Sequence, residues 1–142
     1  MREVLFKGKR KDNGKWIESY TVIRFSDNGF YMPVLHNGAG LKTNELGNIV
    51  GLISLIYEVI PETVGQYTGC CDKSKVTKVF EGDIVWDEID EQYGVVEFDE
   101  GEFIVNFSGN VDAERFADVI NCCYVCGNIH DNPELLKGGA EE

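Results

Sequence analysis

Cysteines come closest, in type and spacing, to forming a metal or redox site. Cys123 and Cys126 are separated by two residues, which is the spacing of one half of a zinc-binding knuckle. A complete site needs a second such pair, but Cys70 and Cys71 are adjacent, so on a strand their side chains point to opposite faces. We therefore expect the five cysteines to be structural buried thiols, with a metal site, a redox pair or a disulfide as alternatives. An odd number of cysteines is typical of a reducing compartment.

The other groups that could do chemistry lack the neighbours that the chemistry needs. His130 precedes Asp131, which makes half of an acid–base pair, but no serine lies on a nucleophile elbow and no pattern places His36 or His130 beside a cysteine. Residues 38–43 resemble a phosphate-binding loop, except that the lysine does not directly follow the last glycine. The acidic run 87–91 lacks the spaced oxygen ligands and central glycine of a calcium loop, and it suits repulsion of an unwanted neighbouring strand. We therefore expect a protein that is not an enzyme and holds no cofactor.

Aromatic side chains could form a platform on which bases or sugars stack. In a small β protein most aromatic residues fill the core, and that is the role we expect for this set. Its members are Trp16, Tyr20, Phe30, Tyr31, Tyr67 and Trp86.

The chain has 142 residues and a formal net charge of −12, distributed unevenly. The formal net charge of residues 1–71 is +1, and that of residues 72–142 is −13. Residues 81–102 contain ten acids and no base, whereas residues 1–15 contain six bases and two acids. Phosphates require Lys and Arg, so nucleic acid is not the expected partner, and the basic N-terminal segment is the one candidate for facing phosphate. The distribution is typical of a solvated surface; alternatively, the two ends attract each other within or between subunits, and association between subunits then weakens as salt rises.

The hydropathy pattern predicts a cytoplasmic protein that does not contact a membrane. The longest apolar stretch, residues 49–60, has twelve residues and contains Glu58, whereas a membrane span needs ~18. The N-terminus turns polar too early for a signal peptide.

Short apolar runs separated by turn residues predict a mainly β fold with short helices. Asn13 and Gly14 predict a tight hairpin turn with both residues at positive φ, and Pro33 should end its strand or lie on an edge. Asp112 and Asn132 are the expected N-caps of the two helices, with Pro133 at the first helical position. Residues 36–47 read as a loop. The expected strands are 4–6, 16–22, 23–25, 30–35, 49–60, 76–80, 84–86, 93–98, 103–107 and 122–129, and the expected helices are 113–119 and a short one from 133.

The alternation of side chains predicts one strand pairing in detail. Phe103, Val105 and Phe107 share a face of their strand, and Val96 and Phe98 share the facing side of the strand before it. A slip of one residue would expose all of them, so the pattern defines the register.

Several segments together resemble the YopX family. They are residues 3–10 with 12–16, residues 61–69, 72–73 and 80–85, residues 94–96, and residues 127–136. The resemblance implies a phage or prophage protein with a mostly β fold, and it implies no activity, because the family has no established function. Cys70, Cys71 and Cys126 depart from the family pattern and look like local substitutions, mostly at apolar positions.

Backbone geometry explains why such motifs need particular residues without being catalytic. Gly65, Gly69, Gly82 and Gly94 are expected where strands turn and φ is positive, and Asp83 is expected to accept hydrogen bonds from turn amides. The order of residues 81–85, an acidic loop and residues 94–96 is similar to the entry of an SH3-like barrel, which is an analogy of fold alone.

The sequence thus predicts a mainly β protein in which an antiparallel N-terminal sheet, residues 1–60, packs with a small SH3-like C-terminal β-barrel, residues 61–136, before a tail at 137–142. We expect a non-enzymatic phage or prophage accessory protein that acts by protein binding or self-assembly, as a homo-oligomer or with a host or phage protein. The expected contact residues are Arg10, Trp16 and Tyr67. The alternatives are an acidic decoy of a host nucleic-acid-binding protein and a nucleic-acid-associated regulator that uses the basic N-terminus.

Overall fold

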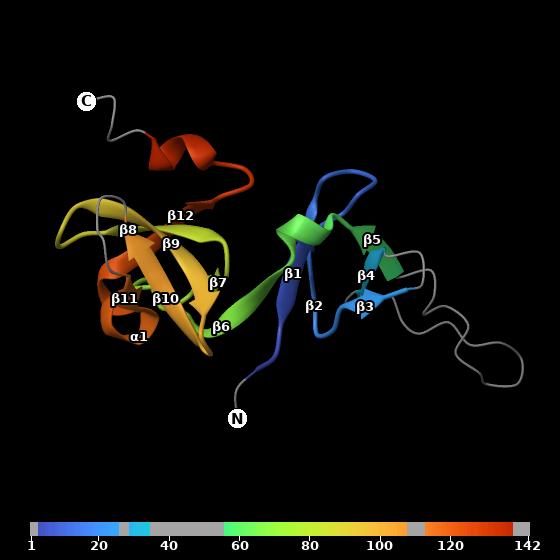
Figure 1. Ribbon diagram of the computed structural model, residues 1–142, viewed down its shortest axis with the longest axis horizontal. Helices are drawn as coiled ribbons and strands as arrows, with labels where there is room; N and C mark the ends of the chain where they lie inside the picture. Colours follow the sequence, from blue (N-terminus) through green and yellow to red (C-terminus); the bar gives the residue numbers. More distant parts are fainter. Residues whose placement is uncertain (1–2, 26–28, 35–55, 108–112, 138–142) are drawn as a thin grey trace, which may run out of the picture. The chain divides into compact units, whose positions relative to one another are not determined.

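The computed structural model describes residues 3–25, 29–34, 56–107 and 113–137, and it divides into two compact units (Figure 1). The first unit comprises Glu3–Gln66 and the second begins at Tyr67. Both are built from antiparallel strands, so the predicted mainly β fold is confirmed. The expected loop at 36–47, the start of the expected strand at 49–60 and the expected helix cap Asp112 lie outside the described residues. No helix in the described part of the chain is long and apolar enough to cross a membrane.

The first unit contains a hairpin and a separate sheet. In that sheet Pro33 ends the middle strand, as expected for a residue without an N–H. Buried Leu5, Met32 and Val59 form the apolar interior. The hairpin strands are β1 (Phe6–Lys9) and β2 (Trp16–Ser19), and the sheet strands, in order, are β3 (Ile23–Arg24), β4 (Phe30–Pro33) and β5 (Ile56–Val59).

The second edge of β1 is covered by three successive segments from far along the chain. Arg10, just after β1, forms a bridge with Val59, and the N–H of Ile60 donates to the carbonyl of Lys9 at 2.9 Å. The 3₁₀ turn η2 (Pro61–Thr63) follows, and the Thr63 hydroxyl accepts the Lys9 N–H at 2.9 Å. The beginning of β6 (Gly65–Cys71) then pairs with the start of β1. A side-chain oxygen therefore bridges the gap between two strands and gives the Lys9 amide an acceptor.

The second unit is an antiparallel sheet in the order β11–β10–β9–β8–β12, beside the pair formed by the end of β6 and β7. A bulge interrupts the β6–β7 pairing between Tyr67 and Cys71. The apolar core includes Val85, Val96 and Phe107. The elements are β7 (Lys78–Phe80), β8 (Asp83–Asp87), β9 (Gln92–Asp99), β10 (Glu102–Phe107), β11 (Glu114–Arg115), α1 (Phe116–Val119), η3 (Ile120–Cys122), β12 (Cys123–Asn128) and η4 (Pro133–Leu136).

The predicted register of β9 and β10 is confirmed. Val96 pairs with Val105 and Phe98 with Phe103, and Gly94 lies opposite Phe107. A Cβ atom on Gly94 would lie 2.6 Å from Val105 Cγ1 and 2.7 Å from Phe107 Cδ1, so this position needs glycine because core side chains fill the space.

The expectation of positive φ at four glycines holds for two of them. Gly69 and Gly82 have φ of 91° and 94°, whereas Gly65 and Gly94 are not in the positive-φ region, so the prediction is wrong there. At Gly94 close packing, and not a turn, excludes a side chain.

In the described residues the strand pairings do not close into a barrel. β11 and β12 lie at opposite edges of the sheet, and no pairing joins them. Figure 1 shows the second unit with β8, β9 and β10 side by side and α1 near the end of the sheet. The antiparallel sheet is thus established, but the SH3-like closure is not.

Two helix predictions need correction. The helix expected over 113–119 begins only at Phe116, because the two residues of β11 pair with β10 instead. Asn132 is the N-cap residue of η4 and Pro133 occupies its first turn, as predicted, but the Asn132 side chain makes no cap bond. Asn132 Oδ1 instead accepts the N–H of Asn128 at 3.2 Å, so the amide closes the preceding turn.

Candidate functional site

The β1–β2 hairpin carries two of the three predicted contact residues, Arg10 and Trp16. Its turn is closed by hydrogen bonds from the Gly14 N–H to the Arg10 carbonyl and from the Arg10 N–H to the Lys15 carbonyl, each 2.9 Å. Gly14 has φ of 72°, but Asn13 is not at positive φ, so the predicted two-residue turn is wrong. Asn13 acts through its side chain, whose Oδ1 accepts the Lys15 N–H at 2.9 Å. A longer turn with a single glycine in the left-handed region results.

Trp16 is half-buried and flanked by two cations. Lys9 is its direct cross-strand partner on β1, and Lys7 lies two residues away on the same face. The Nζ atoms of Lys7 and Lys9 lie 4.7 Å and 5.7 Å from the centre of the indole ring. These are cation–π distances.

Arg10 lies over a second aromatic ring. Its guanidinium carbon is 3.9 Å from the centre of the Tyr57 ring, on β5. Arg10 also donates twice to Asp12, from Nε to Oδ1 at 2.9 Å and from Nη2 to Oδ2 at 2.6 Å. These hydrogen bonds raise the pKa of Arg10 and lower the pKa of the Asp12 carboxyl below its ordinary value of 3.8. The planar fork is thus fixed by both partners.

A shallow depression of about 490 Å³ opens beside this stack. Lys11 and Glu58 form an ion pair across one side, with Nζ and Oε2 3.1 Å apart. Its lining also includes Asp12, Ile56 and Tyr57. We call residues 7–16 with Tyr57 and Glu58 the basic hairpin surface. It combines aromatic rings, an arginine, lysines and two acids. Of these, the aromatic residues and arginine are enriched in protein interfaces.

Tyr67, the third predicted contact residue, belongs to the other unit. Tyr67 is 8% exposed, and its ring packs on the Phe80 ring with centroids 5.5 Å apart. The structure therefore places Arg10 and Trp16 on one hairpin and Tyr67 in the interior of the second unit.

The expectation that the aromatic set fills the cores holds only in part. Tyr67 is buried, Tyr20 is 66% exposed, and the other four are half-buried. The prediction is wrong for Tyr20. Trp86, in β8, packs edge-to-face on Tyr93 with centroids 4.7 Å apart.

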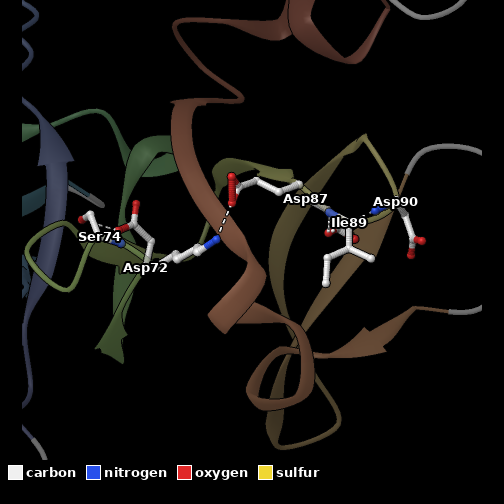
Figure 2. A network of polar contacts seen from close by, with 7 residues as sticks. Asp72, Ser74, Asp87, Ile89 and Asp90 are labelled. Carbon is white, nitrogen blue, oxygen red and sulfur yellow. Dashed lines mark hydrogen bonds and ion pairs between the residues drawn. The ribbon is translucent and has the colours of Figure 1, made fainter.

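Figure 2 shows a polar network in the second unit, which sequence reasoning missed. Asp72 is buried and accepts the Ser74 N–H at 2.9 Å, the Ser74 hydroxyl at 2.6 Å and the Val125 N–H at 2.9 Å. The carboxylate thereby ties the turn after β6 to strand β12. The next residue, Lys73, adds a backbone bond from its N–H to the Cys123 carbonyl at 2.9 Å.

The acidic run 87–91 forms a turn that one of its own carboxylates holds. Asp87 is buried and its Oδ1 accepts the N–H groups of Ile89 and Asp90 at 2.9 Å and 3.4 Å. Figure 2 shows Asp87 beside both residues. Glu88 points to Lys73 in an ion pair of 2.6 Å. The described residues contain no group of three or more His, Cys, Asp and Glu side chains arranged to hold a metal ion.

The cysteines are not uniformly buried. Cys123 is buried, and burial, with a smaller contribution from the nearby Asp87 carboxylate, raises the pKa of its thiol to about 12. Cys70 and Cys126 are exposed, so the expectation of buried thiols is wrong for them. Burial of the sulfur nevertheless raises the pKa of Cys126, whose thiol donates to the Ile84 carbonyl at 3.4 Å.

The comparison with known families agrees with the sequence motifs. The sequence model of the family described as YopX protein matches residues 6–137, which is most of the chain. The chain therefore belongs to the YopX family. A search of curated proteins gives no match.

Residues that carry the family motifs hold the backbone in place. Thr63 and Asp72 bridge distant segments, and Asp83 Oδ2 accepts the Phe80 N–H at 2.8 Å, as predicted for a turn carboxylate. Asn128 Oδ1 accepts the N–H groups of His130 and of the residue after it, each at 2.9 Å. Sequence reasoning could have singled out Thr63 and Asp72 by their side-chain acceptors beside turns, but not their distant partners.

Proposed function

We propose that this YopX-family protein is a non-enzymatic binding protein and that the basic hairpin surface is its contact site. One observation carries the proposal: cations lie over the rings of Trp16 and Tyr57, and Tyr57 also lines an open depression. Aromatic residues and arginine dominate binding energy in protein interfaces when they become desolvated. Here they are already held in place, which lowers the entropy cost of binding.

The pairing of the cations favours a protein partner over nucleic acid. Arg10 and Lys11 are engaged with Asp12 and Glu58, and a phosphate would have to displace these carboxylates. The chain from residue 72 onward adds a formal charge of −13, which repels phosphates at low salt. A polypeptide with both signs of charge fits this surface better. Nucleic-acid regulation through the N-terminus stays an alternative that the experiment below separates.

The acidic-decoy alternative has weaker support. The exposed acids of the sheet divide between the turn at 88–91 and the turn at 99–102. These turns lie at opposite ends of β9, about 25 Å apart for a strand of 8 residues. They therefore do not form one continuous acidic face along the strand.

We also propose, from the family resemblance, a phage or prophage accessory role in the bacterial cytoplasm, and an SH3-like relationship for the second unit. The antiparallel succession β8–β9–β10 followed by a short helix supports the latter.

The test uses the full chain immobilised and exposed to a bacterial lysate, with captured protein and nucleic acid scored separately. Proteins that the wild-type chain captures are identified, and the double variant Arg10→Ala, Trp16→Ala should capture each of them at least ~10-fold less. The affinity is then measured again with the purified partner. The matched control is Arg24→Ala, Tyr20→Ala, which removes one cation and one exposed aromatic from the same unit. Equal capture by both variants overturns the proposal, and capture of nucleic acid alone at low salt replaces it with the regulator hypothesis.

A further inference from the structure

A groove in the second unit exposes a row of phenylalanine rings. Phe98 is 49% exposed, Phe103 is half-buried and Phe116 is 4% exposed. Their rings meet edge-to-face, with centroids 5.0 Å apart for Phe98 and Phe103 and 6.4 Å for Phe103 and Phe116. The row therefore leads from the surface into the core. The groove has a volume of about 250 Å³, and Cys70 also lines it.

Acidic residues of the β9–β10 turn lie beside this phenylalanine groove. Glu102 lines the groove, and Asp99 and Glu100, exposed in the same turn, precede it in the sequence. Among the described residues that line the groove, Arg115 is the one cation, and it is already paired with Glu102 at 3.1 Å. An occupant that complements the groove must bring an apolar group flanked by positive charge.

We propose that the phenylalanine groove receives the basic hairpin of a second copy of this chain. This proposal rests on the proposed function, because it uses the same hairpin as a contact surface. The hairpin presents a half-buried indole, Trp16, between cations, and this complements an apolar groove beside the acidic β9–β10 turn. Charge complementarity of this kind selects the partner and its orientation. The opposite formal charges of residues 1–15 and 81–102 match the same orientation.

The symmetry of the contact follows from the two different surfaces. The hairpin of one copy meets the groove of the next, so the contact is head-to-tail and not two-fold symmetric. Such contacts produce closed rings or open chains, and each copy needs both surfaces intact to extend the assembly.

This requirement gives a complementation test with the full chain. One variant, Trp16→Ala with Lys9→Glu, disables the contact surface of the hairpin. The other, Phe98→Ser with Glu102→Lys, disables the contact surface of the groove. Sedimentation velocity should show assembly of the wild type with rising concentration, at least ~10-fold weaker self-association for each variant, and recovery of a 1:1 dimer when the two are mixed. In the mixture one hairpin and one groove remain intact, so growth stops at two chains.

The matched control is Ile89→Ser with Glu88→Lys at the opposite turn of the same sheet, where Ile89 is 71% exposed. It should assemble like the wild type, and circular dichroism should show that all variants are folded. A monomeric wild type at every concentration overturns the groove proposal but leaves the hairpin free to bind another protein. Assembly lost in the hairpin variant but kept in the groove variant overturns the groove alone. A groove variant that dimerises by itself also overturns it, because the contact would then be symmetric.

Discussion

Replacing the Asp72 carboxylate should remove the hydrogen bond that joins β12 to the turn after β6. Asp72→Ala removes an acceptor from three donors, two on Ser74 and one on the Val125 backbone. Ser74 is exposed, so water can replace the carboxylate there, whereas the Val125 N–H is partly buried. A hydrogen bond to a charged group contributes about 1.5–3 kcal/mol, and an unsatisfied buried donor costs a similar amount. We expect the free energy of unfolding of the second unit to fall by about 3 kcal/mol.

Tryptophan fluorescence can report each unit separately, because the chain has two tryptophans, Trp16 in the first unit and Trp86 in the second. In a Trp16→Phe background, urea denaturation followed by Trp86 measures the loss directly. Ser74→Ala, which removes one donor from the same carboxylate, is the control and should cost less than about 1 kcal/mol. The loss of unfolding free energy in Asp72→Asn should lie between those of Asp72→Ala and Ser74→Ala, because the amide keeps one oxygen acceptor. If Asp72→Ala costs no more than Ser74→Ala, the carboxylate does not hold β12 and the reasoning fails.

Three further outcomes are expected. Thr63→Val should destabilise the first unit by about 1–2 kcal/mol in urea denaturation because it leaves the β1 amide without an acceptor, whereas Thr63→Ser should retain most of the stability; equal effects would contradict the bridge. Gly94→Ala should cost about 1–3 kcal/mol by overpacking the core, measured by the shift in thermal midpoint, and a neutral result would mean that the strands separate easily. At about pH 8 a thiol reagent should label exposed Cys70 before unfolding and Cys123 only after it. Because burial raises the pKa of Cys123 from 9.0 to about 12, the second unit should be fully stabilised by this group below pH 9 and lose that contribution as the pH rises towards 12. The stability of Cys123→Ala should therefore fall less steeply over this pH range than that of the wild type, and equal slopes would contradict the assignment.

Local patterns account for the elements that could be predicted from sequence. The pairing of β9 with β10 follows from alternating apolar residues on both strands, since a slip would expose Phe103 and Val96 together. The shortened helix shows the limit of such reasoning, because pairing of Glu114 and Arg115 with a neighbouring strand overrides helix propensity. Asn13 shows that a turn signal can be read correctly while the turn type is not.

The candidate site could be predicted only where its residues are close in sequence. Arg10 and Trp16 stand out by type and spacing, but Tyr57 and Glu58 reach them from a strand 47 residues away from Lys11. No periodicity encodes such a contact. The same holds for Asp72, whose partner on β12 is 53 residues further along the chain.

The covering of β1 by segments that follow β5 also constrains when the first unit can form. The acceptor of the Lys9 amide is a hydroxyl 54 residues further along the chain. The unit therefore depends on contacts of long sequence separation, which form late because the loop between them must close first. During synthesis, the hairpin at 6–19 emerges well before the residues that close its open edge. A nascent chain ending before residue 63 should therefore leave this edge available to other strands, and chaperone engagement at that length would protect the protein from premature aggregation.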